Sequence, residues 1–564
     1  MKKHRSFFAT VFILSYVISS ATNYYVDATL GNDTYSGKSA ALAWKSLNKV
    51  SNAWIKGGDS VLFKRGETFR GNITAVKNGS TTGAVVYGAY GTGNKPILMG
   101  SVQKNQTGDW VNIGTNLWET SSALIDDVGN IIFNNEASCG IKVKAATALN
   151  GQGKFFSTTT FKVQMYSVSN PATFYTNIEL AVTVKLIHLL ENRYITFENL
   201  DLKYTGAQGI QGRANNNIWI KDCDFAYIGG GYLTGTTRYG NPVTFYGSNN
   251  NCIVERCTFR QAYDVAMSAQ GDEVDNLVYN IYFRNNLVDK CEQSFEFWCR
   301  GANAQAHDIY FENNTCTNAG SGWSRTQRPD PNAVHLLFWG SDSTTVLSNI
   351  FIRNNIFSNA VDAGIFDSSK AYEGTKSSVI TIDNNCWNVI NQIAIQTGWD
   401  NARPGPTTTK YKAATYKTNT GNDAKSIFAN PLLNSDNTLS STSPCVNAGL
   451  SLPTVLTDFN KSVRPSAGSD IGAFESFLTS LTSSINDNYT SIVSPTIAID
   501  KLTLNPAVIT NNEILYVYSI SGRLVMQLQL INSIQNIDIS NLESGMYIVR
   551  LKSKPNMSSS FIKK

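Results

Sequence analysis

A short block recurs between about residues 192 and 390 and constrains the fold more than any other feature of the chain. In each copy apolar and other residues alternate, and an Asn-rich turn follows. A period of two indicates strands, and repetition at roughly 20–50 residues indicates a solenoid. Strands stacked ~4.8 Å apart bury their apolar faces in one continuous core, so the sequence predicts an all-β parallel β-helix. The copies read ITFENLDL from Ile195, IWIKDCDF from Ile218, CIVERCTF from Cys252, IYFRNNLV from Ile281, IYFENNTC from Ile309, IFIRNNIF from Ile350 and ITIDNNCW from Ile380.

The Asn residues of these blocks fall where each coil must bend, and Asn tolerates the left-handed backbone conformation found in turns. Stacked side chains at Asn286, Asn314, Asn355 and Asn385 could form an amide hydrogen-bond ladder, so a structural role is predicted for them. Nine cysteines lie far apart, without the paired spacing of a zinc site. Cys223 and Cys257 occupy equivalent positions in successive coils and could either pack inertly or form a bond.

The two ends of the chain suggest export. Residues 1–21 combine a basic start, an apolar stretch and small residues, which is typical of a cleavable secretion signal. No other long apolar run exists, so no membrane span is expected. Without the basic start the protein is nearly neutral, and nothing in its composition suggests a nucleic-acid partner. A Ser/Thr/Asn-rich stretch at 477–497 is predicted to be a linker.

Residues 498–564 resemble a known sorting module. The segments LNP from Leu504, YSISGR from Tyr518, IDIS from Ile537 and GMY from Gly545 are similar to the C-terminal sorting domain of type IX secretion cargo. That resemblance implies a small C-terminal β-sandwich, the type IX secretion machinery as a partner, and a secreted or outer-surface location. It implies nothing about chemistry.

The body resembles secreted right-handed β-helix proteins of the pectin-lyase-like kind, many of them polysaccharide lyases and glycoside hydrolases. YYVDATLGNDTYSG and GGDSVLFKRGETFRG are similar to their amino-terminal cap, and SPCVNAGL followed by DIGAFE is similar to their closing segment. We therefore expect the cap and first coils at 22–100 and the β-helix with the candidate active face at 191–476. Residues 101–190 show no coil pattern and are expected to be irregular coils or an inserted β lobe.

The second strand of each coil offers an aromatic strip. VTFYGS from Val243, FEFWCR from Phe295 and LLFWGS from Leu336 place Tyr246, Trp298 and Trp339 at the same position. Stacked aromatic rings bind the apolar faces of sugars. Strand periodicity does not decide between this role and packing inside the coil.

Overlaying these strands by their Phe-Trp pairs stacks Asp264, Ser294 and His335, with Glu296 two residues along the same face and Arg300 beyond it. Asp264 and Glu296 would then be diagonal neighbours roughly 7–8 Å apart at Cβ. Such a spacing suits an acid and a base on either side of a glycosidic bond. The alternative is that Asp264 caps a turn and Glu296 is a solvated strand residue.

Two insertions could form walls beside this face. The segment TNAGSGWSRTQRPDPNA leads directly into His335, and its Trp323, Arg325 and Arg328 could clamp an acidic sugar, since Arg binds carboxylates and sulfates bidentately. The segment GGGYLTGTTRYGN could supply Arg238 with two tyrosines as a facing wall. Either segment could equally be an ordinary exposed turn.

No cofactor is expected. Asp272, Glu273 and Asp275 form an acidic turn with oxygen ligands of the kind that calcium prefers, but without the ligand periodicity of a calcium site, so a solvated turn is favoured.

Three functions remain open for a monomeric protein that acts on a polysaccharide. The leading hypothesis is a hydrolase with Asp264 and Glu296 as acid and base, and with His335 and Arg325 or Arg328 positioning substrate or stabilising charge. The second is a lyase acting on a uronic-acid polymer, with His335 or Lys290 as the base and Arg325 and Arg328 neutralising the carboxylate. The third is a glycan-binding solenoid or adhesin without turnover.

Overall fold

The computed structural model describes two parts of the chain. The first is residues 21–476, except 272, 329, 331, 340–343, 368–378, 390–392, 401–402, 412–416 and 419–420. The second comprises residues 493–494, 497–498, 500–504, 513–519, 524–530, 536–553 and 558–563. The predicted signal segment up to residue 20 and most of the predicted linker lie outside these described residues.

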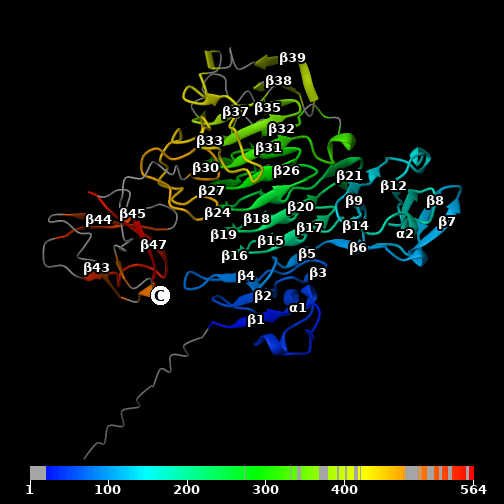
Figure 1. The fold of residues 1–564 in the computed structure, drawn as a ribbon, viewed down its shortest axis with the longest axis horizontal. Coiled ribbons are helices and arrows are strands. Elements are labelled where there is room, and N and C mark those ends of the chain that lie inside the picture. The colour runs from blue at the N-terminus through cyan, green and yellow to red at the C-terminus, as the bar shows by residue number, and fades with distance from the viewer. Residues whose placement is uncertain are drawn as a thin grey trace, which may run out of the picture.

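Three long sheets, parallel except for the hairpin at one end of the third, wind into the predicted parallel β-helix (Figure 1). From β16 (Arg193–Glu198) to β38 (Ala394–Asp400) each coil contributes one strand to each sheet, and the repeated sequence block begins in the first-sheet strand and ends in the second-sheet strand. Ile281 pairs with Ile309, Ile309 with Ile350, and Ile350 with Ile380, so the blocks stack in register. The strands of the first sheet are β1 (Asn23–Val26), β2 (Ser60–Lys64), β4 (Val85–Tyr90), β16 (Arg193–Glu198), β19 (Asn216–Lys221), β24 (Asn250–Glu255), β27 (Leu277–Arg284), β30 (Gln305–Glu312), β33 (Val346–Arg353) and β36 (Ile380–Asp383).

The other two sheets complete each coil. The second contains β3 (Thr68–Arg70), β5 (Ile97–Met99), β17 (Asp201–Thr205), β20 (Asp224–Ile228), β25 (Thr258–Arg260), β28 (Leu287–Asp289), β31 (Thr315–Ala319), β34 (Ile356–Ala360), β37 (Cys386–Asn388) and β40 (Ile427–Phe428). The third contains β15 (Ile187–Leu190), β18 (Ile210–Arg213), β23 (Val243–Tyr246), β26 (Val265–Gly271), β29 (Gln293–Cys299), β32 (Val334–Phe338), β35 (Ala363–Asp367), β38 (Ala394–Asp400) and the antiparallel β39 (Arg403–Tyr411).

The turn between the first and second sheets contains the predicted amide ladder. The backbone and side-chain nitrogens of Asn286 both donate to Asn314 Oδ1, at 2.9 and 3.0 Å, and Asn314 donates in the same way to Asn355. Asn355 continues the ladder to Asn385. The residue before each ladder Asn, such as Asn313 with φ of 52°, adopts the left-handed conformation. The ladder therefore satisfies buried polar groups at this bend in four successive coils.

The cysteines pack without bonding. All nine belong to the described part of the chain and all are free thiols. Cys223 and Cys257 are fully buried at the ladder position of their coils, and the Cys257 amide donates to Asn286 Oδ1 at 3.0 Å. Inert packing is the alternative that the structure supports.

Residues 101–182 form a lobe that projects from the side of the solenoid (Figure 1). It has two mainly antiparallel sheets and its own apolar core around Phe133, Phe155 and Met165, which corresponds to the inserted-lobe alternative. Its elements are β6 (Ser101–Gln103), η2 (Thr107–Asp109), β7 (Trp110–Gly114), β8 (Leu117–Thr120), β9 (Val128–Phe133), β10 (Ser138–Cys139), β11 (Ile141–Lys142), η3 (Ala146–Ala148), β12 (Lys154–Ser157), β13 (Val163–Tyr166), α2 (Pro171–Phe174) and β14 (Ile178–Val182).

Smaller elements complete the β-helix. The cap contains η1 (Ala40–Leu42) and α1 (Leu47–Asn52), the hairpin β21 (Gly231–Thr234) and β22 (Thr237–Tyr239) precedes β23, and η4 (Arg325–Gln327) precedes β32. The closing segment, residues 429–476, returns along the Asn turns. Arg464 donates to Asn285 Oδ1 at 2.9 Å, and Asn313 donates to the carbonyls of Asp470 and Gly472. These bonds tie the last segment to coils far earlier in the chain.

The C-terminal part has two sheets around a separate core, as expected for a small sandwich. Leu502 and Ile537 from one sheet and Val517 and Val549 from the other are buried together. Within the described residues, no helix is long and apolar enough to cross a membrane. The strands are β41 (Val493–Ser494), β42 (Ile497–Ala498), β43 (Lys501–Leu504), β44 (Ile514–Ser519), β45 (Leu524–Gln529), β46 (Asn536–Asp538), β47 (Gly545–Leu551) and β48 (Ser558–Lys563).

Candidate active site

The outer face of the third sheet carries the candidate site. Phe295 and Phe297 of β29 belong to the apolar core of the coil, so the alternating residues Glu296 and Trp298 point outward. Glu296 lies level with Ser268 of β26 and Leu337 of β32, and Trp298 lies level with Gln270. The aromatic residues of the strip are thus on the outside of the solenoid, not in its interior.

Glu296 is a buried carboxyl held by two neutral donors. Only 8% of the residue is exposed. Trp339 Nε1 donates to its Oε1 at 2.7 Å, and the Gln270 amide donates to its Oε2. Burial, followed by the negative charge of Asp264, raises the pKa of Glu296 to about 7, although both hydrogen bonds act in the opposite direction. A substantial fraction of Glu296 is therefore protonated near neutral pH, as a general acid requires.

Asp264 lies just before β26 and is paired with a cation from a long loop. Its Oδ1 is 2.5 Å from Arg328 Nη1, and its side chain is one-fifth exposed. The other oxygen, Oδ2, has no hydrogen-bond partner in the described part of the chain. Asp264 is thus a charge-compensated carboxylate with one oxygen available, close enough to Glu296 for its charge to raise the pKa of that residue.

The predicted overlay of the third-sheet strands is wrong for Asp264. Val265 pairs with Gln293, so Asp264 lies level with Glu292 and not with Ser294. The overlay relied on Phe-Trp pairs, and the strand after Asp264 has none, because Ala269 and Gln270 occupy those positions. In the observed register Asp264 is offset from Glu296 by one coil and four residues along the strand, not two, so the Cβ separation of 7–8 Å, which assumed that overlay, is not supported.

The register also reveals a row of carboxylates that the sequence analysis missed. Asp264, Glu292 and Asp362 immediately precede β26, β29 and β35, and Ala333 occupies the equivalent position before β32. Aligning the acidic residue before each third-sheet strand, instead of the aromatic residues within it, would have given the observed register.

His335 lies inside the solenoid. It is level with Ser294, as predicted, and its Nδ1 is 3.0 Å from Ser294 Oγ. The residue is 0% exposed, and its ring packs 5.4 Å from that of Phe357. Burial lowers the pKa of His335 to about 3, so the ring is neutral. From this position it cannot contact a polysaccharide on the outer face.

The Trp323 loop, residues 320–333, uses its arginines to bind the carboxylate row. Arg325 lies 3.3 Å from Glu292 Oε1 and 3.2 Å from the Asp362 carboxylate. Arg328 pairs with Asp264. Both cations predicted to clamp an acidic sugar are therefore already paired within the protein.

Trp323 and Arg238 join the same wall. The indole of Trp323 packs against Tyr263 with ring centroids 5.5 Å apart and donates to the Gln261 carbonyl. Arg238, from β22, also lies over the ring of Tyr263, at 4.5 Å, and donates to Gln327 Oε1 at 3.0 Å. The backbone nitrogen of Lys142, in the lobe, also donates to that oxygen. The loop, the hairpin and the lobe thus form one connected wall beside Asp264.

The aromatic strip borders the carboxyl pair on its other side. The rings of Tyr246 and Trp298 meet edge to face at 6.3 Å, and Trp339 packs against Phe366 at 6.1 Å. Arg300 lies over Trp298 with its guanidinium carbon 4.5 Å from the ring. Tyr246 and Trp339 are half-buried, which leaves part of each ring accessible to a ligand.

No metal centre is evident among the described residues, where no group of three potential ligands gathers. In the acidic turn, Glu273 pairs with Arg213, and Asp272 lies outside the described residues. Calcium at this turn stays an untested alternative.

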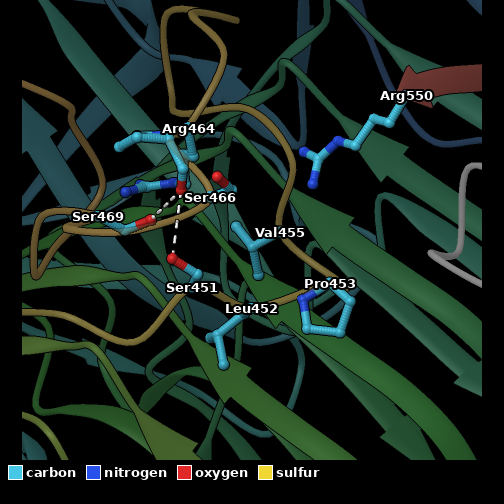
Figure 2. A pocket seen from close by; sticks show the side chains of 9 residues that line it. Ser451, Leu452, Pro453, Val455, Arg464, Ser466, Ser469 and Arg550 are labelled. Atoms are coloured by element: carbon cyan, nitrogen blue, oxygen red, sulfur yellow. Dashed lines mark hydrogen bonds between the residues drawn. The ribbon is translucent and has the colours of Figure 1, made fainter. Parts of the chain in front are cut away.

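A cavity also lies between the closing segment and β47, lined by Ser451, Arg464 and Arg550 among others (Figure 2). Inside it the hydroxyls of Ser451 and Ser469 donate to the Pro465 carbonyl. No carboxylate lines this cavity, so it lacks the acid–base pair found on the third sheet.

The C-terminal part and the body of the chain differ in how closely they match known proteins. Residues 495–564 match the family described as the secretion system C-terminal sorting domain. This confirms the resemblance of that part to a type IX sorting domain and supports a secreted or cell-surface location.

The body shows only partial similarity to known proteins. Lacto-N-biosidase of Bifidobacterium longum is 30% identical over 132 residues, which cover 21% of this chain and 8% of that protein. A structure described as a glycoside hydrolase aligns with a TM-score of 0.42 at 10% identity, covering 67% of this chain and 94% of the other. A complex of XylC with xylose aligns with a TM-score of 0.41 at 12% identity, covering 66% and 68% of the two chains.

Proposed function

We propose that this protein is a secreted glycoside hydrolase that cleaves a polysaccharide on the outer face of its third sheet. The observation that carries the proposal is Glu296, a buried carboxyl whose pKa is raised to about 7 in part by the charge of a second, ion-paired carboxylate, Asp264. Two carboxyl groups whose environments differ in this way can divide the roles of acid and base.

Glu296 acts as the general acid. Its proton passes to the glycosidic oxygen as the bond to the sugar carbon breaks, so the leaving sugar departs as a neutral alcohol. Trp339 and Gln270 fix the orientation of the carboxyl group through one hydrogen bond to each oxygen. They position the acid and do not themselves exchange protons.

Asp264 supplies the second carboxylate. Through Oδ2 it either removes a proton from the attacking water or attacks the sugar carbon itself, and the oxocarbenium-like transition state benefits from its negative charge. Arg328 holds Oδ1 and keeps the carboxylate in place. The two routes give opposite anomeric products, so the configuration of the first product distinguishes them.

The lyase hypothesis receives less support from these contacts. Of its two candidate bases, His335 is enclosed in the core, whereas Lys290 is exposed in the turn after β28. Both candidate neutralising residues, Arg325 and Arg328, are paired with carboxylates of the protein. A binding protein without turnover would have no need for a buried carboxyl group with a raised pKa.

The test is an activity assay of the mature protein on neutral, uronic and sulfated polysaccharides. New reducing ends without an unsaturated, ultraviolet-absorbing product are expected. In Glu296→Gln and Asp264→Asn the rate should fall by about 10²–10⁴-fold. The exposed carboxylate Glu273 provides the matched control, because Glu273→Gln should retain activity. Full activity in both site variants would refute the proposal, and an unsaturated product would establish a lyase instead.

A further inference from the structure

One cation on the candidate face is not compensated within the described part of the protein. Arg300 follows β29 directly, and its guanidinium makes no ion pair or hydrogen bond there; its guanidinium carbon lies 4.5 Å from the centre of the Trp298 ring. By contrast, Arg328 pairs with Asp264, and Arg213 pairs with Glu273. A half-buried, uncompensated cation at the Trp298 end of the strand that contains Glu296 is available to a ligand.

The stacking on Trp298 orients this cation for binding. The guanidinium carbon lies 4.5 Å from the ring centroid, and its N–H groups donate to no described residue, so they are available to an anion. The backbone holds the position, since the Arg300 amide donates to the Gly271 carbonyl at 2.8 Å. Planar donors of this kind bind carboxylates or sulfates bidentately.

The position of Arg300 relates it to the site of cleavage. Glu296, Trp298 and Arg300 are alternate residues, and the guanidinium lies on the same side as the outward Trp298. Arg300 lies four residues from Glu296 on the side away from Asp264, and four residues of strand span about 13 Å, within reach of a neighbouring sugar unit. Arg300 would therefore set specificity without taking part in the chemistry.

We propose that Arg300 and Trp298 form a subsite for an acidic sugar unit, with Tyr246 as the adjoining aromatic surface. This inference rests on the proposed hydrolase and narrows its substrate to a polymer or oligosaccharide carrying carboxylate or sulfate groups. The anion binds the in-plane N–H donors of Arg300, and the sugar ring packs on the accessible part of Tyr246.

The experiment compares matched substrates in the full-length secreted protein. Polygalacturonate is paired with its carboxyl-reduced form, and chondroitin sulfate with its desulfated form. In Arg300→Met, kcat/KM on the preferred acidic substrate should fall about tenfold or more, while kcat/KM on its neutral counterpart changes less than about twofold. Arg300→Lys should retain part of the preference, and Arg213→Met, which removes a cation already paired with Glu273, should retain all of it.

Binding to the Glu296→Gln variant, measured by calorimetry with the same oligosaccharides, separates failure of this inference from failure of the proposed function. Cleavage without any preference for the acidic form, unchanged by Arg300→Met, would overturn the subsite and leave the hydrolase intact. Tight binding of acidic chains that Arg300→Met abolishes, without cleavage in the wild type, would support the subsite and refute the hydrolase. Equal binding of both forms would also overturn the subsite.

Discussion

At the scale of single residues, the proposed chemistry depends on two carboxyl groups in different surroundings. Burial, together with the negative charge of Asp264, raises the pKa of Glu296 to about 7, whereas Asp264 forms an ion pair with Arg328 at 2.5 Å. One group can therefore give up a proton near neutral pH, and the other carries a compensated negative charge. Sequence patterns show which residues are acidic, but the surroundings that make them different come from elements far apart in the chain.

The hydrogen bond from Trp339 to Glu296 lowers the pKa of that carboxyl, since it favours the charged form. Trp339→Phe should therefore raise the pKa, and the alkaline limb of kcat/KM should move upward by up to about one pH unit. Trp219→Phe is the control, because it removes a comparable indole donor from Glu255 on the first sheet. If the alkaline limb of kcat/KM stays at the same pH in Trp339→Phe, ionisation of Glu296 does not control that limb.

Glu296 should also make stability depend on pH. Its pKa is about 7 in the folded protein against an ordinary value of 4.5, so the folded state retains the proton more strongly. The carboxyl carries no electrostatic cost when both states are protonated, below pH 4.5, and destabilises the fold as pH rises through 7. The free energy of unfolding of Glu296→Gln, relative to that of the wild type, should increase by up to about 3 kcal/mol between about pH 5 and pH 8. Urea unfolding of both proteins at about pH 5 and pH 8 measures this increase. The same stability difference between variant and wild type at the two pH values would contradict the prediction.

At the scale of elements, the sequence predicts the first sheet and its turns better than the third sheet. The repeated blocks and the Asn286–Asn385 ladder follow local patterns that every coil repeats, and the structure has both. The third-sheet register at Asp264 was mispredicted, because β26 lacks the aromatic pair used for alignment. The sequence also did not predict the ion pairs of Arg325 and Arg328, since their carboxylate partners lie one or more coils away.

The Trp323 loop should depend on Arg325 for its placement. Arg325→Met leaves the buried Glu292 carboxylate without its cation, which should cost about 3 kcal/mol in the free energy of unfolding. Limited proteolysis within residues 320–333 should accelerate at the same time. The double variant Arg325→Met/Glu292→Gln should recover much of the stability, because no uncompensated charge remains. Equal losses in the single and double variants would contradict this role.

At the scale of the whole molecule, the proposed active site and the sorting domain belong to parts with separate cores. The solenoid and the C-terminal sandwich share no core residue, and the closing segment ties itself to the Asn turns through Arg464 and Asn313. The sandwich matches the family of secretion system C-terminal sorting domains over residues 495–564. The site on the third sheet combines residues from several coils and a loop, so no single segment identifies it.

A chain ending at Ser476 should therefore fold and retain catalytic activity after purification, since it keeps the complete solenoid and its closing segment. Circular dichroism and kcat/KM on the same substrate should match those of the longer chain within about twofold. Loss of the β-sheet signal on removal of the sandwich would show that the two cores depend on each other. A chain ending at Ala429 is the comparison, because it lacks the bonds to Asn285 and Asn313 and should be less stable.

The most direct test of the central claim is the pH dependence of kcat/KM for the wild-type protein on its best polysaccharide, between about pH 5 and pH 9. If Glu296 is the general acid, kcat/KM should decline above an apparent pKa near 7 and fall about tenfold per pH unit thereafter. A rate that stays level or rises across that range would contradict the account, because the essential group would then act in its deprotonated form.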